Sequence, residues 1–475
     1  MSPRLPRRMT LVFVLALLMS VLPARPGAAT APELTCAGVT EIPLAECQAL
    51  EALYASTNGA QWYDRAGWTT TTTPCSWYGV TCQAGRVSEL DLRDNNLAGP
   101  LPAQLGNLTQ LRVLNLKRNA ITGGLPAGLG GLVQLQILDL SENALTGAIP
   151  TQLGALAVLQ TLNLGNNQLT GGIPTQLAGL AALQTLDLST NQLSGEIPGA
   201  LGGLASLQVL GLNNNQLSGA IPAQLANLTQ LRLLLLANNN LTGSIPTGLS
   251  GLSNLTHLVL TRNQLSGQIP AQLGSLSQLS VLMLSNNRLT GSIPASLGNL
   301  GNAFEIWLNS NALSGAVPAN LCDLQGLFFL DTAYNSLSSA PDCMAFLDPE
   351  WDQTQTVAPM ALSAAPGDVQ VSLGWTPIAY QSNDGHYEIS YRPAGGTFVV
   401  HGVTASKAVS SYMVTGLMPE TNYEFRVRTY TAAHMEPPAY QQNALWSGYA
   451  VVNVRTLPAG SSITRSIFLP LVTKR

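Results

Sequence analysis

The sequence has little charge and few residues suited to acid–base or metal chemistry. Asp, Glu, Lys and Arg make up 10% of its 475 residues, and the formal net charge is −4. This balance disfavours nucleic acid or an anionic membrane surface as a partner. The histidines have no metal-ligand spacing and no evident nucleophile beside them. There are four: His257, His386, His401 and His434. No phosphate-binding loop occurs, so we expect no catalytic residue, no bound metal and no cofactor.

Long apolar runs are scarce, and the clearest one, Leu11–Leu22, lies near the start of the chain. Three arginines precede it: Arg4, Arg7 and Arg8. Small residues ending at Ala31 follow it, and together these features predict a secretory signal peptide over residues 1–31. An uncleaved anchor is the alternative, but the run is shorter than the about 20 residues that cross a bilayer. We therefore expect a secreted or cell-surface protein whose mature chain has no transmembrane segment.

Glycine and proline are abundant, with 44 and 29 residues, but they recur with a fixed spacing of 24 residues. An asparagine marks each of eleven units without an insertion: Asn95, Asn119, Asn143, Asn167, Asn191, Asn215, Asn239, Asn263, Asn287, Asn311 and Asn335. A fixed period of this length is typical of stacked repeats that contact only their neighbours. Residues 90–337 are therefore predicted to form one solenoid.

Within each unit, apolar and outward residues alternate, as in Leu138-Asp139-Leu140. This alternation predicts a short strand with both leucines buried, and strands of successive units stack about 4.8 Å apart in one parallel sheet. The repeated asparagine follows the strand and can satisfy backbone groups of the neighbouring turn, so we expect a buried, structural hydrogen-bonding ladder. The fold class is an α/β solenoid.

Six cysteines lie outside the regular units, in two groups at the ends of the repeats: Cys36, Cys47, Cys75, Cys82, Cys322 and Cys343. An even number in an exported chain indicates disulfides, and no CxxC pair or histidine cluster supports a metal site instead. The connectivity stays open, although the grouping favours sequential pairing: 36 with 47, 75 with 82, and 322 with 343.

The segment Leu169-Thr170-Gly171-Gly172-Ile173-Pro174 resembles the plant-type subclass of the leucine-rich repeat family, and this resemblance covers residues 90–337. It implies a right-handed, curved solenoid with the main sheet on its concave face and short extra strands outside that sheet. The octapeptide CSWYGVTC at residues 75–82 resembles the N-terminal cap of plant receptor-kinase ectodomains. That resemblance implies a bond between Cys75 and Cys82.

The repeats need caps at both ends because an end repeat has only one neighbour. Residues 32–89 are predicted to form the N-terminal cap, with a helix over 44–56. Four apolar residues are assigned to one face of this helix: Leu44, Cys47, Leu50 and Leu53. Residues 338–356 are predicted to form the C-terminal cap and a linker.

Residues 357–457 lose the repeat and show the period-two alternation of a half-buried antiparallel sheet, as at 423–428. Trp375 and the later Leu417-x-Pro419-x-x-x-Tyr423 resemble the fibronectin type III family. The resemblance implies an all-β sandwich with Trp375 in the core and Tyr423 as its tyrosine corner. No Arg-Gly-Asp occurs, so integrin-like adhesion is not carried over. The tail, 458–475, contains a short apolar segment that is either a terminal strand or a surface-sorting tag.

The outward residue at the centre of each repeat strand forms a column along the concave sheet: Asp91, Asn115, Asp139, Asn163, Asp187, Gly211, Leu235, Val259, Met283, Trp307 and Asp331. Its first five members are polar, whereas later ones form an apolar run. Apolar residues flank that run one column over: Val209, Leu233, Val281 and Phe329, with His257 among them. An exposed apolar area is usually an interaction surface, and tryptophan is enriched in binding hot spots. The predicted ligand contacts are Leu235, Val259, Met283 and Trp307, with Asp139 and Asp187 as polar contacts. Repeat drift, or a fibronectin domain folded over these positions, would also explain the pattern.

These features predict a non-enzymatic binding protein whose concave face binds an extracellular or surface protein. A carbohydrate-binding or cell-wall-associated module is the alternative, in which the polar rungs and Trp307 bind a glycan by hydrogen bonding and stacking. A glycosidase is a remote third, because Asp91 and Asp139 lie two rungs, about 10 Å, apart. Nothing on an open surface would desolvate either carboxylate for that chemistry. The ligand and the oligomeric state do not follow from the repeat.

Overall fold

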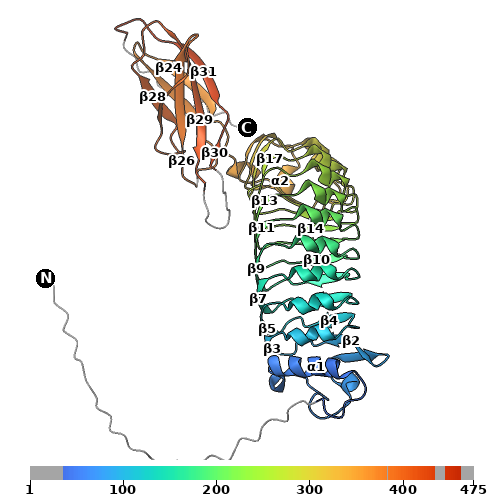
Figure 1. Cartoon of the computed structure of the whole chain (residues 1–475). Helices are drawn as coiled ribbons and strands as arrows, with labels where there is room; N and C mark the ends of the chain where they lie inside the picture. Colours follow the sequence, from blue (N-terminus) through green and yellow to red (C-terminus); the bar gives the residue numbers. More distant parts are fainter. Residues whose placement is uncertain (1–35, 382, 434–443, 462–475) are drawn as a thin grey trace, which may run out of the picture.

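The computed structural model describes residues 36–381, 383–433 and 444–461, which form an elongated repeat solenoid followed by a β-sandwich (Figure 1). Three features named above lie outside these residues: the signal peptide at 1–31, His434, and the apolar part of the tail.

A 12-stranded sheet runs the length of the solenoid. Its first two strands pair antiparallel, and each later strand pairs parallel with the strand of the preceding repeat. Most strands have three residues because one buried leucine lies between two outward side chains, as Leu138 lies between Ile137 and Asp139. The strands are β1 (Val80–Gln83), β2 (Arg86–Asp91), β4 (Val113–Asn115), β6 (Ile137–Asp139), β8 (Thr161–Asn163), β10 (Thr185–Asp187), β12 (Val209–Gly211), β14 (Leu233–Leu235), β16 (His257–Val259), β18 (Val281–Met283), β20 (Glu305–Trp307) and β22 (Phe329–Asp331).

The predicted short extra strands form two further parallel sheets, one of seven and one of four strands. They are β3 (Ala98–Pro100), β5 (Ala120–Gly123), β7 (Ala144–Ala148), β9 (Gln168–Gly171), β11 (Gln192–Glu196), β13 (Gln216–Ala220) and β15 (Asn240–Thr242), then β17 (Ser266–Gln268), β19 (Arg288–Gly291), β21 (Ala312–Ala316) and β23 (Ser336–Ser339).

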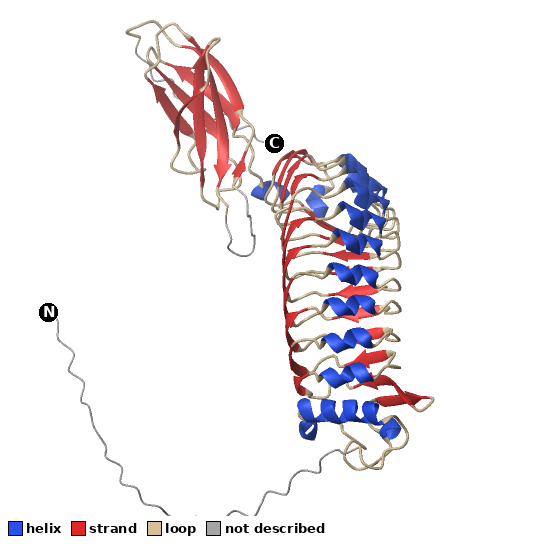
Figure 2. Ribbon diagram, in the orientation of Figure 1, coloured by secondary structure: helices blue, strands red, loops and turns tan. Residues whose placement is uncertain are grey.

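Each of the first ten repeats continues from an apolar residue and a proline, such as Ile149-Pro150, into a five-residue 3-10 helix, and Figure 2 shows these helices stacked in one column along the solenoid. Leucines of each helix, such as Leu153, and of the segment after it, such as Leu156, are fully buried. The helices are η3 (Ala103–Asn107), η4 (Ala127–Gly131), η5 (Thr151–Ala155), η6 (Thr175–Gly179), η7 (Gly199–Gly203), η8 (Ala223–Asn227), η9 (Thr247–Gly251), η10 (Ala271–Ser275), η11 (Ala295–Asn299) and η12 (Ala319–Asp323).

The asparagine ladder is confirmed, and Asn143 shows its pattern. Its Nδ2 donates to the carbonyl oxygens of Leu116 and Leu140 at 3.0 and 3.1 Å, and its Oδ1 accepts the backbone N–H of Ile121 at 3.0 Å. One side chain thus joins two consecutive rungs. Because the pattern recurs along the solenoid, the ladder satisfies backbone groups that the tight turns would otherwise leave unpaired.

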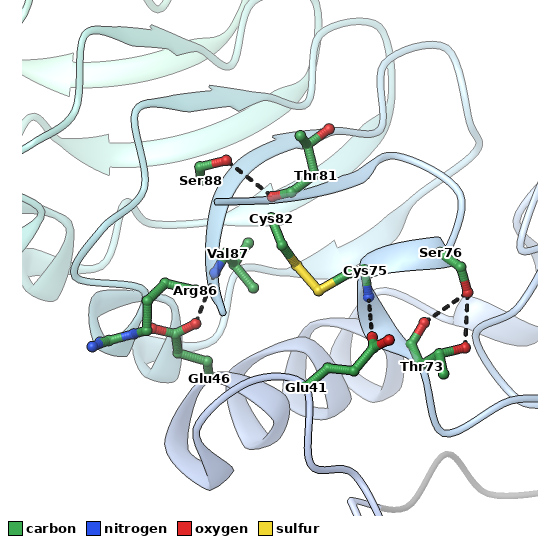
Figure 3. The surroundings of a disulfide bond; sticks show 10 residues. All are labelled: Glu41, Glu46, Thr73, Cys75, Ser76, Thr81, Cys82, Arg86, Val87 and Ser88. Carbon is green, nitrogen blue, oxygen red and sulfur yellow. Dashed lines mark hydrogen bonds and ion pairs between the residues drawn. A yellow bond between two sulfur atoms is a disulfide. The ribbon is translucent and has the colours of Figure 1, made fainter. Parts of the chain in front are cut away.

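The N-terminal cap closes the first rung with a buried carboxylate. Helix α1 (Leu44–Ser56) contributes Glu46, which is 1% exposed, pairs with Arg86 and accepts the backbone N–H of Val87 at 2.9 Å. Figure 3 shows this contact beside the Cys75–Cys82 disulfide. The other disulfides join Cys36 to Cys47 and Cys322 to Cys343, the sequential pairing that the grouping favours.

One assignment in this cap is wrong. Leu44 was placed on the buried face of α1, but its side chain is 62% exposed, whereas Cys47, Leu50 and Leu53 are fully buried. At about 100° per residue, a spacing of three residues drifts by about 60° at each step. Leu44 therefore projects roughly opposite to Leu53.

The C-terminal cap supplies the groups that a further repeat would have supplied. Asp348 follows the short helix α2 (Met344–Leu347) and accepts both the backbone N–H and the hydroxyl of Thr332 at 2.8 Å. Gln355 ends the asparagine ladder, because its Oε1 accepts the N–H of Leu337 at 3.0 Å and its Nε2 donates to the Thr332 carbonyl at 3.1 Å.

The second domain is a β-sandwich of a three-stranded sheet and a five-stranded sheet, as its alternation predicts. Its strands are β24 (Met360–Pro366), β25 (Gln370–Thr376), β26 (Gly385–Pro393), β27 (Val399–Val403), β28 (Ser411–Thr415), β29 (Asn422–Thr431), β30 (Leu445–Trp446) and β31 (Ala450–Arg455). Trp375 is buried in the core, and the hydroxyl of Tyr423 accepts the backbone N–H of Met418 at 3.0 Å, which is the predicted tyrosine corner.

The two domains meet through a small contact. The ring of Tyr334, in the last repeat, packs edge-on against Tyr380 with centroids 5.7 Å apart. Thr356 of the linker donates a hydrogen bond from its hydroxyl to that of Thr431 at 2.8 Å. Figure 1 shows the sandwich beyond the C-terminal end of the solenoid.

Candidate binding surface on the concave sheet

The strand register brings the predicted column together. Leu235 lies opposite Val259, Val259 opposite Met283, and Met283 opposite Trp307, and the same register continues in both directions from Asp91 to Asp331. The four apolar side chains named as contacts are all half-buried, so each exposes part of its surface.

In the polar half of the column, the side chains have a structural task. Asp187 Oδ1 accepts the backbone N–H of Ser189 at 2.9 Å, and Asp139 Oδ1 accepts the N–H and the hydroxyl of Ser141 at 3.0 and 2.6 Å. Asn163 makes the same bond to the N–H two residues later at 3.1 Å. Each side chain thus closes a local turn after its strand. That task accounts for Asp and Asn here without any ligand.

The apolar half gives up this turn bond. Gly211, Leu235, Val259, Met283 and Trp307 have no strong side-chain acceptor. The repeat therefore gains no local hydrogen bond from these residues, and it leaves apolar surface partly exposed in exchange. Such a loss is expected where a surface is kept apolar for a partner.

Two pairs of packed aromatic rings lie in the last two rungs of the main sheet. Trp307 packs on Phe329 with centroids 4.4 Å apart, and its indole N–H donates to Glu305 at 3.1 Å. Phe304 and Phe328 stack on each other at 5.5 Å and remain 46% and 72% exposed. The fibronectin domain therefore does not cover them.

Phe304 and Phe328 are not among the contacts predicted from the sequence. They occupy the position immediately before the strand, which holds glutamine at 136, 160, 184 and 208. The change from glutamine to phenylalanine in the last two units was a readable signal. A column made of strand residues alone does not include this position, because it precedes the strand.

A pocket of about 400 Å³ opens within the apolar half. It is lined by Ala237, Asn238, Val259, Thr261, Arg262, Met283, Ser285, Asn286, Trp307 and Asn309. Three of the four predicted apolar contacts belong to this lining, whereas Leu235, Asp139 and Asp187 do not. The lining adds a set of amides and hydroxyls that the column alone did not reveal.

The column ends in a carboxyl group with unusual electrostatics. Burial raises the pKa of Asp331 to about 6, and the nearby carboxylate of Asp348 also raises it, while a hydrogen bond from the Ala333 N–H at 3.0 Å opposes the shift. Asp331 pairs in register with Trp307. Near neutral pH, the end of the column next to Trp307 therefore carries a poorly solvated negative charge.

The residues considered for chemistry remain apart. Asp91 is paired with Arg93 at 2.7 Å, and Asp139 is bonded to Ser141. Within the described ranges, no cluster of three or more His, Cys, Asp or Glu side chains could hold a metal ion. In the same ranges, none of the helices is both long and apolar enough to cross a membrane.

Comparison with known families follows the same division of the chain. Residues 79–214 match the leucine-rich repeat region family, residues 205–265 and 229–289 match the leucine rich repeat family, and residues 44–83 match the leucine rich repeat N-terminal domain. Residues 357–442 match the fibronectin type III domain. Solenoid, cap and sandwich thus define a repeat scaffold of the kind used for binding. The chain is a leucine-rich repeat protein with a fibronectin type III domain.

Two of the similar curated proteins are receptor kinases of Arabidopsis thaliana. A probable leucine-rich repeat receptor-like protein kinase of Arabidopsis thaliana is 53% identical over 47 residues, which are 10% of this chain and 7% of that protein. The receptor kinase FEI 2 of the same plant is 56% identical over 43 residues, or 9% of this chain and 7% of its own length. The chain therefore matches a small part of these curated relatives.

Solved structures give longer matches. The ectodomain of the Arabidopsis receptor kinase GASSHO1/SCHENGEN3, in complex with CASPARIAN STRIP INTEGRITY FACTOR 2, is 37% identical with a TM-score of 0.58, covering 61% of this chain and 37% of that one. Arabidopsis HAESA, in complex with the peptide hormone IDA and the co-receptor SERK1, is 37% identical with a TM-score of 0.55, covering 61% and 50%. A plant ice-binding protein is 29% identical with a TM-score of 0.54, covering 64% and 96%.

Proposed function

We propose that this protein is secreted or held at the cell surface and binds an extracellular protein through the apolar half of its concave sheet. The observation that carries the proposal is the switch within one column. Asp and Asn close a turn in the first half, and partly exposed apolar side chains replace them in the second. Burial of the apolar half against a partner would recover the free energy of removing that surface from water.

The aromatic residues Trp307 and Phe328 support the same conclusion. Trp307 is held by Glu305 and Phe329, so little side-chain freedom is lost when a partner packs on it. Phe328, at 72% exposure, offers a second large apolar contact on a neighbouring rung. Preorganised aromatic side chains of this kind are typical hot spots of protein interfaces.

The similar ectodomains are consistent with a protein or peptide ligand, since HAESA is in complex with the peptide hormone IDA and the co-receptor SERK1, and GASSHO1/SCHENGEN3 is in complex with CASPARIAN STRIP INTEGRITY FACTOR 2. The ice-binding protein shows that the same scaffold serves a different ligand. The scaffold therefore does not decide the function, and the residues on the rungs must.

An extracellular location is supported by the three disulfides, which persist in oxidising compartments. The predicted signal peptide is tested by expressing the full chain and sequencing the N-terminus of the exported protein. Export with an N-terminus near residue 32 is expected, and retention of the leader on a membrane would contradict it.

The binding test compares residues 32–475 with the variant Met283→Asp/Trp307→Ala, each immobilised and exposed to surface and secreted extracts. Both proteins must first give the same circular dichroism and thermal unfolding. The matched control is Asn115→Asp/Asn163→Asp, which adds charge to the same column in its polar half and keeps the turn acceptor. A protein retained by the parent and the control but lost from the first variant is expected. Equal capture by all three would contradict the proposal.

A further inference from the structure

The pocket inside the apolar half has two chemically different walls. One wall consists of Val259, Met283 and Trp307, with the indole fixed by its hydrogen bond to Glu305. The other wall consists of side-chain amides and hydroxyls: Asn238, Thr261, Ser285, Asn286 and Asn309. The Thr261 and Ser285 hydroxyls lie 3.1 Å apart and bond to each other. A ligand that fills this space needs an apolar face and several uncharged polar groups.

Two amides of the polar wall have unused hydrogen-bonding capacity. Asn286 is 8% exposed, and its Oδ1 and the Oδ1 of Asn309 are buried without a hydrogen-bond partner among the described residues. Buried acceptors in folded proteins are nearly always paired, because an unpaired one is unfavourable. The terminal torsion of asparagine is soft, so either amide can turn toward a donor in the pocket.

The repeat itself does not require these amides. The position of Asn309 holds alanine at 237 and 333 and asparagine at 213, and the position of Asn286 holds threonine at 190, serine at 310 and asparagine at 166, 214 and 238. Asparagine at 286 does suit its left-handed backbone, at φ 55°, but other side chains adopt the same backbone in other units. The repeat thus allows asparagine at both positions without requiring it, and what sets Asn286 and Asn309 apart is that their side-chain oxygens, among the described residues, are buried without a partner in a pocket that also contains Trp307.

We propose that this pocket binds a neutral pyranose ring of an extracellular glycan; the inference rests on the proposed function, because the pocket is part of the same concave surface. Sugar hydroxyls both donate and accept, which matches amides and hydroxyls, and the apolar C–H face of a pyranose can lie on the Trp307 indole. One ring carries several hydroxyls, so it can satisfy several amides at once.

The charge of the lining argues against a cationic ligand, and the size of the pocket suits a sugar ring. Arg262 carries the single formal charge among the ten lining residues, and no carboxylate belongs to the lining. A cationic ligand would therefore lack a counter-charge in the pocket. The volume of about 400 Å³ lies within the range of roughly 300–1,000 Å³ that is typical of small-molecule sites. The sugar can belong to a free polysaccharide or to a glycan attached to a protein.

The test variant is Asn286→Gly/Asn309→Ala. Glycine keeps the left-handed backbone without strain, and alanine is the residue of other units at that position. The control, Asn166→Gly/Asn213→Ala, makes the same changes at the same repeat positions outside the pocket. Calorimetric titration with cellotetraose, mannotetraose and xylotetraose tests whether the pocket binds a free polysaccharide. Capture from extracts, with and without mild periodate to open sugar rings, tests whether the pocket binds a glycan attached to a protein.

Binding of a neutral tetrasaccharide, or capture that periodate abolishes, is expected for the parent and the control, with at least a tenfold loss in the test variant. Two outcomes overturn the inference: neither assay detects sugar dependence, or the test variant binds as well as the control. If protein capture resists periodate and the test variant but is lost with Met283→Asp/Trp307→Ala, the inference fails and the proposed function stands. If that last variant captures everything the parent does, the proposed function fails.

Discussion

The two halves of the concave column have the same backbone but use their side chains differently. In the first half, residues such as Asp139 and Asp187 bond to the N–H two residues later and so stabilise their own turn. In the second half, Val259, Met283 and Trp307 form no such bond and instead expose apolar surface. Because the geometry of the rungs is constant, the difference is a property of sequence alone. The side chains of the first half are explained by their role in the scaffold, whereas those of the second half form no such bond, and a binding partner or repeat drift must account for them.

The largest expected effect on partner binding comes from removing an aromatic side chain from the second half of the column. Trp307→Ala is expected to weaken capture of the protein partner about 100-fold, because a central hot-spot residue contributes about 2–4 kcal/mol to binding. Ile137→Ala is the matched control: Ile137 is 37% exposed and lies in the column beside the polar half. Surface plasmon resonance with the captured partner measures both. Similar losses in the two variants would show that the halves do not differ in function.

The next largest effect is expected at the end of the column. The pKa of Asp331 is raised by burial to about 6, so the folded state favours the protonated carboxyl. Its stabilising contribution is complete below the ordinary carboxyl pKa near 4 and is lost as the pH rises through about 6. Asp331→Asn keeps the acceptor for the Ala333 N–H but carries no charge.

The free energy of unfolding of Asp331→Asn is therefore expected to exceed that of the parent by about 1–2 kcal/mol at pH 7.5 and to equal it at pH 4. Thermal unfolding at both pH values, with hydrogen exchange at the C-terminal repeats, measures the difference. A stabilisation that is the same at both pH values would rule out ionisation of Asp331 as its cause.

A smaller effect, on the free energy of unfolding, is expected in the first half of the column. Asp187→Ala removes the acceptor for the Ser189 N–H and is expected to lower the free energy of unfolding by about 1 kcal/mol, the usual net value of one hydrogen bond. Asp187→Asn keeps the acceptor and is expected to unfold like the parent. Urea unfolding followed by circular dichroism compares the two. Partner binding that survives both changes would remove Asp187 from the predicted contacts.

The sequence predicted the regular part of the molecule well because the period fixes each residue's position. Once the ladder asparagines were aligned, the register of the column from Asp91 to Asp331 followed, and the structure has that register. The same reasoning failed where the chain leaves the period. Leu44 was placed by its i, i+3 spacing, which drifts around a helix, and Gln355 was not foreseen as the last member of the ladder.

The candidate site was predicted in part for a related reason. Columns of outward strand residues can be read from a repeat, so Val259, Met283 and Trp307 were found. The pocket also uses Asn286 and Asn309, which follow the strands and come together only through the turn geometry. Their burial and their unpaired oxygens are tertiary properties that no spacing encodes.

The smallest effect is expected for a substitution that gives the second half of the column a side chain typical of the first half. Val259→Asn places a turn acceptor at a position that has none, in reach of the Thr261 N–H when it adopts the geometry of Asn163. The new hydrogen bond, about 1 kcal/mol, should roughly offset the lost apolar contact of the half-buried valine, also about 1 kcal/mol. The free energy of unfolding is then expected to stay within about 1 kcal/mol of the parent, while the protein partner binds more weakly. Thermal unfolding and surface plasmon resonance measure the two quantities on one sample. Intact binding together with a clear gain in stability would mean that the apolar residue was an unimproved repeat position, and repeat drift, rather than a partner, would then explain the second half.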